Sequence, residues 1–149
     1  MKKFSFPLEK VLQYKVSLLQ EEKNRLSMLR AELARTEGEI AENTQQLLDS
    51  DAQLKNLAAK GTNICTLRSL QFKIDNTRRL LEGLELVRNK QAALVETQLA
   101  VVLEANRSVS GIERLKDKQM EIYHEAQQKE EALIIGELVS TKYTLSGHS

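Results

Sequence analysis

The fold is decided by residues 12–57, LQYKVSLLQEEKNRLSMLRAELARTEGEIAENTQQLLDSDAQLKNL. Apolar side chains recur in this stretch at a strict spacing of seven residues: Leu12, Leu19, Leu26, Leu33, Ile40, Leu47 and Leu54. The companion heptad column is apolar at three positions and otherwise polar: Leu8, Lys15, Glu22, Leu29, Thr36, Asn43, Ser50 and Leu57. This pattern predicts a long coiled-coil helix with a half-polar seam.

A second heptad pattern predicts another helix from about Thr66 to Lys142. One column of this pattern consists of Leu80, Val87, Leu94, Val101, Ser108, Leu115 and Ile122. The other consists of Leu70, Thr77, Leu84, Gln91, Gln98, Ala105, Ile112, Gln119, Ala126 and Leu133. We expect these two columns to form the seam of the second helix.

One reversal of the chain is expected, because Lys60-Gly61-Thr62-Asn63 is the main turn signal between Pro7 and the C-terminal tail. A turn centred near Thr62 places Leu12 opposite Ile112, Ile40 opposite Leu84 and Leu54 opposite Leu70. The fold class predicted is therefore all-α: a long antiparallel two-helix coiled-coil hairpin, forming a single domain over residues 1–149. Its helices are expected at about 6–59 and 66–142, with the turn at about 60–65 and a short C-terminal tail.

The second predicted helix is longer than the first, so the chain after about Lys116 has no intrachain partner in this arrangement. This overhang is still apolar, at Ile122, Tyr123, Leu133, Ile134, Ile135, Leu138 and Val139. Burial of such side chains is favourable, which predicts a partner protein. A frayed C-terminal end is the alternative.

Glycines lie inside both helical patterns, and each costs about 1 kcal/mol relative to Ala. In the expected register, Gly38 and Gly83 lie at a similar level of the hairpin. Two interpretations remain open: a locally soft zone, or close packing of the two helices.

Composition and motifs argue against an enzyme. The 149 residues include 22 Lys or Arg and 21 Asp or Glu, which removes the excess of cations that non-specific nucleic-acid binding requires. The sequence contains neither a P-loop motif nor G-x-G-x-x-G, and a two-helix rod lacks a concave site. We expect no catalytic residues, no cofactor and no metal. Glu121-x-x-His124 has ligand-like spacing, but bundle metal sites need such pairs from several helices.

The single cysteine, Cys65, is read as a spectator in a reducing compartment. Neither a signal peptide nor a membrane span of roughly 18 apolar residues is evident. A cytoplasmic protein without direct membrane insertion is therefore expected.

The opening FSFPLEKVLQYK, Phe4–Lys15, resembles the start of the FliJ family of flagellar export proteins. Its most specific feature is a proline at the first helical turn, after two phenylalanines. The resemblance continues in IERLKDKQ, Ile112–Gln119, and in the Glu-rich end of the chain.

This resemblance implies a non-enzymatic component of the flagellar type III export apparatus, similar to the central stalk of rotary ATPases. Such a protein binds the hexameric export ATPase FliI, promotes its ring, couples it to the export gate protein FlhA and is linked to escort of export chaperones. The ATPase regulator FliH is a further candidate partner. A monomer in the cytoplasm, peripherally associated with the inner-membrane export apparatus, is implied.

Residue by residue, the resemblance implies an ATPase-facing end and a gate-facing position. The ATPase-facing residues would be Phe6, Leu8, Val11, Leu12, Leu133, Leu138 and Tyr143, and Phe72 would face the export gate. A generic structural or adaptor coiled coil, or the equivalent stalk of a related injectisome, remains as the alternative. An adaptor would form concentration-dependent dimers, whereas a stalk would be monomeric.

Overall fold

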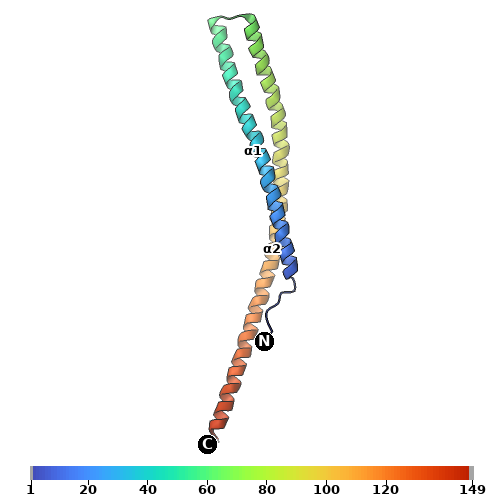
Figure 1. The fold of residues 1–149 in the computed structure, drawn as a ribbon, viewed down its shortest axis with the longest axis vertical. Coiled ribbons are helices and arrows are strands. Elements are labelled where there is room, and N and C mark those ends of the chain that lie inside the picture. The colour runs from blue at the N-terminus through green and yellow to red at the C-terminus, as the bar shows by residue number, and fades with distance from the viewer. Residues whose placement is uncertain (1, 148–149) are drawn as a thin grey trace. The chain divides into compact units, whose positions relative to one another are not determined.

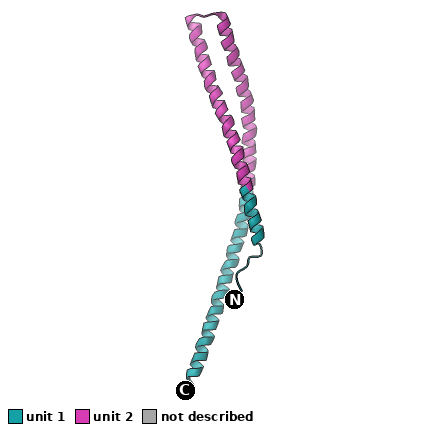
Figure 2. Cartoon of the chain, viewed as in Figure 1, with its two compact units in different colours: residues 1–20, 104–149 teal, residues 21–103 magenta. Residues whose placement is uncertain are grey.

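The computed structural model describes residues 2–147, which form two long helices and, within that range, no strand. Helix α1 is Glu9–Lys60 and helix α2 is Ile64–Gly147 (Figure 1). The predicted all-α helical hairpin is confirmed. Contacts divide the chain into two units (Figure 2): unit 1 consists of residues 1–20 and 104–149, and unit 2 of residues 21–103.

The turn of unit 2 is built from three residues between the helices. Gly61 ends α1 with φ at +79°, in the left-handed region that costs glycine least. Asn63 then begins α2 as its N-cap, because its side-chain oxygen accepts a hydrogen bond from the Cys65 N–H at 2.9 Å. The backbone carbonyl of Asn63 also accepts from the Thr66 and Leu67 N–H groups. The chain therefore reverses direction at Lys60-Gly61-Thr62-Asn63, as the turn signal in the sequence predicts.

The predicted seam of α1 is confirmed. Every member of the column from Leu12 to Leu54 is buried or half-buried, and so is every member of the companion column from Lys15 to Leu57. Polar residues take part in this seam: Thr36 and Ser50 are as deeply buried as the leucines. Only the first companion residue, Leu8, is exposed.

The seam of α2 is confirmed in one column and wrong in the other. The column from Leu70 to Gln119 is buried or half-buried throughout. The second buried column is Ile74, Leu81, Arg88, Val95, Val102, Val109, Lys116 and Tyr123. The column predicted in its place lies largely outside, with exposed Leu80, Val87, Leu94, Val101, Leu115 and Ile122.

The reason for this error is geometric. A helix seam needs two columns separated by three and four residues, and the Leu70 column satisfies this spacing with either candidate neighbour. The Leu80 column is the more apolar, since the other contains Arg88 and Lys116. Packing against α1 selects between them, and hydrophobicity alone does not.

Both helix bounds differ somewhat from the expected ones. Helix α1 begins at Glu9, because Pro7 and Leu8 form a turn in which the Glu9 N–H donates to the Phe6 carbonyl at 3.1 Å. Helix α2 continues to Gly147, since no proline interrupts it. Of the expected C-terminal tail, His148 and Ser149 lie outside the described residues.

The glycines within unit 2 have open surroundings. A Cβ atom added at Gly38 or Gly83 would meet nothing within 4 Å. Close packing of the two helices therefore does not explain why glycine stands at these two positions. Each glycine lowers the stability of its helix relative to alanine, and no close contact compensates for that loss.

Candidate functional site

The C-terminal part of α2 is the largest exposed apolar surface of unit 1. Every residue from 131 to 147 is exposed. Apolar members of this stretch are Leu133, Ile134, Ile135, Leu138, Val139, Tyr143 and Leu145, each at least half exposed. We call residues 133–145 the apolar tip. Side chains of this kind and number are seldom left in water unless they bind another molecule.

The apolar tip is hydrophobic on most sides rather than along one stripe. Leu133, Ile134 and Ile135 are consecutive, and each step along a helix of 3.6 residues per turn rotates the side chain by about 100°. Val139 and Tyr143 extend the coverage further around the axis. A single partner helix covers one face of a helix, so this distribution favours a partner that surrounds it.

The N-terminal segment of unit 1 crosses α2 as a non-helical strap, residues 2–8. Phe6 is buried, and the Phe4 ring lies against Tyr123 with centroids 5.4 Å apart. The Tyr123 hydroxyl donates a hydrogen bond to the Lys2 carbonyl at 2.7 Å. These contacts fix the strap on α2 where α1 has not yet begun.

An ion pair fixes the start of α1 next to the strap. Lys116 Nζ lies 2.7 Å from Glu9 Oε2, and both side chains are partly exposed. The pair is within one residue of the register expected from a turn at Thr62. Because solvent screens such pairs, its contribution is about 0.5 kcal/mol, and its main effect is on register.

The structure separates the residues assigned to the ATPase-facing end. Phe6 and Leu12 are buried within unit 1, whereas Leu8 and Val11 are 38% and 42% exposed. Leu133 lies ten residues beyond Tyr123 on α2, or about 15 Å at 1.5 Å per residue. Leu138 and Tyr143 lie farther along the same helix. In unit 1 the apolar tip is therefore an accessible surface, whereas Phe6 and Leu12 are buried in the packing of unit 1 itself.

The gate-facing candidate, Phe72, lies in unit 2. Its side chain is 67% exposed, on the outer side of α2 two residues before the buried Ile74.

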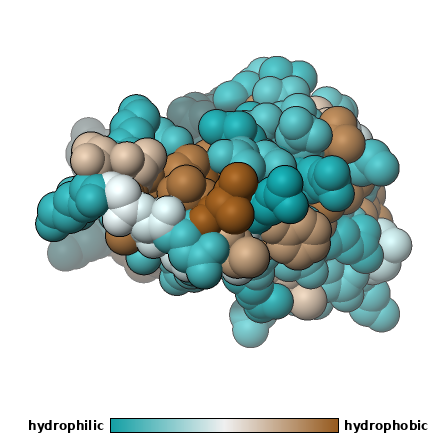
Figure 3. Space-filling view, turned by 90° about the horizontal axis from the view of Figure 1, so that it is seen from above, coloured by the Kyte–Doolittle hydropathy of each residue, from teal (hydrophilic) through white to brown (hydrophobic). Residues whose placement is uncertain are grey.

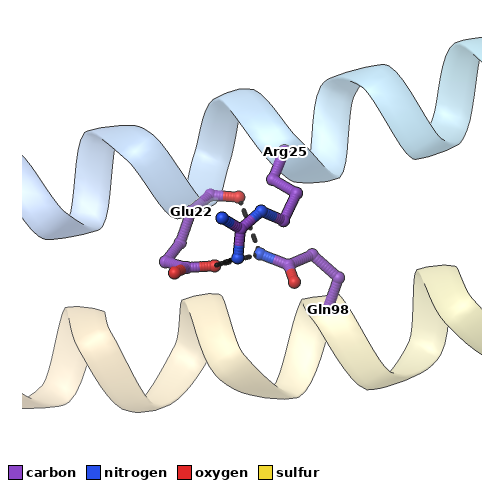
Figure 4. Close-up of polar contacts among 3 residues, drawn as sticks. All are labelled: Glu22, Arg25 and Gln98. Atoms are coloured by element: carbon purple, nitrogen blue, oxygen red, sulfur yellow. Dashed lines mark hydrogen bonds and ion pairs between the residues drawn. The ribbon is translucent and has the colours of Figure 1, made fainter.

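A polar cluster interrupts the seam of unit 2 (Figure 4). The side-chain amide of Gln98 on α2 donates to the backbone carbonyl of Glu22 on α1 at 3.0 Å and also to the Glu22 carboxylate. Arg25 approaches the same carboxylate at 3.5 Å. Polar pairs of this kind specify helix register at some cost in stability.

The sequence analysis missed the strap contacts. An aromatic residue at 123 in the heptad pattern, together with two phenylalanines before Pro7, was the available signal. This signal indicates that aromatic side chains are available in both segments, but it does not show which of them are in contact.

Within residues 2–147, no group of three or more His, Cys, Asp or Glu side chains could hold a metal ion. The hollows in that range are open surface grooves, such as the one between the strap and α2, lined by Phe4, Phe6, Glu9, Lys116 and Met120. In the same range, neither helix has a stretch long and apolar enough to cross a bilayer.

Comparison with known proteins identifies a family: the flagellar FliJ protein family matches residues 4–147 of the chain. No curated protein and no solved structure matches the chain. Because the family match covers nearly the whole sequence, the chain belongs to the flagellar FliJ protein family, whose members are components of the flagellar protein export apparatus.

Proposed function

We propose that this chain is a stalk-like coupler that seats its apolar tip in the pore of the hexameric export ATPase FliI. The observation that carries the proposal is the distribution of apolar side chains around α2 between Leu133 and Leu145, all exposed in unit 1. A ring of subunits covers a helix on all sides, as this distribution requires. The coupler has no catalytic residues of its own and acts by binding.

The mechanism proposed is a shift between conformations of the ATPase. A stalk alters an equilibrium only if its affinity differs between the states of the ring. Unequal contacts between the apolar tip and the subunits that surround it supply this difference, because a single helix presents different side chains to different subunits of the ring. Leu8 and Val11, which are partly exposed at the start of α1, extend the proposed contact.

A second functional contact is proposed at Phe72, in unit 2, with the export gate protein FlhA. Its support is the 67% exposure of an aromatic side chain that does not pack in unit 2. Phe72→Ala should weaken binding of the FlhA cytoplasmic domain, whereas Leu86→Ala, at an equally exposed position, should not. Equal binding by both variants would remove Phe72 from the proposal. FliH and export chaperones stay as further proposed partners.

The chain is proposed to act as a monomer. Each helix already has a seam filled by the other within the chain, which reduces the need for a second copy. Sedimentation velocity at low micromolar concentration should give a single monomeric species. A stable dimer under those conditions would favour the adaptor alternative.

The direct test is ATP hydrolysis and hexamer formation by FliI, measured with and without the chain. Leu138→Asp introduces a charge into the proposed contact, so it should abolish stimulation of both. Leu86→Asp is the matched control, because Leu86 is also 65% exposed on α2 and lies in unit 2. This control should stimulate like the unmodified chain.

Two results would contradict the proposal. In the first, the unmodified chain leaves the hydrolysis rate and hexamer formation unchanged. In the second, Leu138→Asp and Leu86→Asp stimulate equally, so that the apolar tip is not the contact.

A further inference from the structure

The end of unit 2 that contains the turn is basic. Between Lys55 and Arg79 the sequence has six Lys or Arg residues and one acidic residue, Asp75. The remaining parts of unit 2, residues 21–54 and 80–103, have six Lys or Arg and eleven acidic residues. The charges of unit 2 are thus segregated, although the whole chain is close to neutral.

Most of these cations have no acidic partner. Lys55 is paired with Asp51 at 3.4 Å, and the Asp75 carboxylate accepts a hydrogen bond from the Gln71 amide at 3.0 Å. No ion pair within residues 2–147 involves the other five cations, all of which are exposed: Lys60, Arg68, Lys73, Arg78 and Arg79. Their charge is available to an anionic partner.

Two large apolar side chains are exposed among these cations, Ile64 at 63% and Phe72 at 67%. Phe72 follows Arg68 by four residues and precedes Arg79 by seven, so the three share the outer side of α2. Figure 3 views the molecule from above relative to Figure 1 and shows apolar surface interspersed with hydrophilic surface. Aromatic side chains flanked by cations are typical of segments that bind at the surface of a lipid bilayer.

The cations form an arc around the outer side of α2, and Lys73 also lines an open hollow with Cys65 and Leu70. Lys73 and Arg78 lie directly beside the seam residues Ile74 and Thr77, on either flank of the outer side that holds Arg68 and Arg79. A folded acidic protein would need carboxylates fixed in matching positions around this arc. Lipid head groups are mobile, so they can rearrange around the cations, and the long Lys and Arg side chains can extend to the bilayer surface.

We propose that the outer side of α2 from Arg68 to Arg79 binds an anionic bilayer surface, with Phe72 entering the head-group layer. This interaction goes beyond the coupler function, since its ligand is lipid. It shares Phe72 with the proposed FlhA contact, so a bilayer and FlhA would compete for that side chain.

The test is co-sedimentation of the full chain with vesicles of phosphatidylglycerol and phosphatidylcholine, compared with phosphatidylcholine alone, at low salt. Binding should occur only to the anionic vesicles and should fall as salt is added. The triple variant Arg68→Gln, Lys73→Gln, Arg79→Gln should bind about 100-fold more weakly, from about fivefold per cation.

A matched variant controls for net charge. Arg114→Gln, Lys118→Gln and Lys129→Gln remove the same charge from exposed positions of unit 1 and should leave vesicle binding unchanged. Absence of binding to anionic vesicles, or equal loss in both triple variants, would overturn the proposal. Binding of poly-glutamate at these cations without binding of vesicles would assign the surface to an acidic protein and would also overturn it. Since FliI and FlhA are absent, failure here is independent of the coupler test.

Discussion

Gln98 on α2 donates its side-chain amide to the backbone carbonyl of Glu22 on α1, at 3.0 Å, and to the Glu22 carboxylate. The two residues are separated by 76 positions in the sequence and are brought together by the seam of unit 2. Gln91, one heptad earlier in the same column, differs: its side-chain oxygen is buried without a hydrogen-bond partner. Two glutamines in equivalent heptad positions therefore have opposite energetic consequences.

Replacement of each glutamine by leucine tests this difference. Gln91→Leu should raise the free energy of unfolding by about 1 kcal/mol, because it removes an unsatisfied buried oxygen. Gln98→Leu should lower it by about 1 kcal/mol, because the largely buried Glu22 carboxylate loses its partner on α2. Urea denaturation followed by circular dichroism measures both values. An unchanged or higher free energy of unfolding in Gln98→Leu would show that the Gln98–Glu22 contact does not stabilise the seam, and a lower one in Gln91→Leu would contradict the account of Gln91.

The observed seam of α2 is tested by truncating one residue from each candidate column. Ile74 is 1% exposed, so Ile74→Ala should lower the free energy of unfolding by about 3 kcal/mol. Leu80 is 51% exposed, and Leu80→Ala should cost less than about 1 kcal/mol. The reverse order in thermal or urea denaturation would restore the column that the sequence alone favours.

Heptad periodicity was sufficient to predict the fold class and the seam of α1 from Leu12 to Leu57, because the column from Leu12 to Leu54 repeats without interruption. The turn was also predictable, since Gly61-Thr62-Asn63 is the main turn signal between Pro7 and the C-terminal tail. Heptad periodicity was not sufficient for α2. There the Leu70 column has apolar neighbours on both sides, and only the positions of α1 side chains decide which neighbour is buried. Arg88 and Lys116 occupy seam positions that no hydrophobicity scale would select.

Glycine substitution tests the open surroundings of Gly38. Gly38→Ala should raise the free energy of unfolding by about 1 kcal/mol, since the added Cβ meets nothing within 4 Å and helix propensity improves. Gly61→Ala is the contrasting control: its φ of +79° is unfavourable for alanine, so stability should fall by about 1 kcal/mol. Loss of stability in Gly38→Ala would show that the helices need a close approach there.

The strap of unit 1 is tested at Tyr123. Tyr123→Phe removes the hydrogen bond to the Lys2 carbonyl while it retains the ring packed on Phe4, so the backbone amides of residues 3–6 and of Leu8 should exchange hydrogen faster. The expected loss in the free energy of unfolding is about 1 kcal/mol. Tyr143→Phe, at a position 80% exposed, should change neither quantity. Unchanged exchange in the Tyr123 variant would mean that the strap is held by Phe4 and Phe6 alone.

The candidate site could be predicted only in part. Exposed apolar residues beyond the end of the shorter helix follow from helix lengths, which is why Leu133, Leu138 and Tyr143 were identifiable from the sequence. The burial of Leu12 followed from its place in the heptad column, whereas the burial of Phe6 did not, since Phe6 precedes Pro7 and lies outside both heptad columns. Tertiary contacts of the strap with Tyr123 decide whether Phe6 is buried.

Hydrogen exchange of the apolar tip in the presence of the export ATPase tests the central claim most directly. In the free chain, amides of residues 131–147 should exchange quickly, because these residues are exposed on a helix that nothing packs against along this stretch. Addition of hexameric FliI should slow exchange there by at least about tenfold, while residues 61–79 of unit 2 remain unchanged. Unaltered exchange throughout residues 131–147, under conditions where FliI is saturated with the chain, would contradict the account.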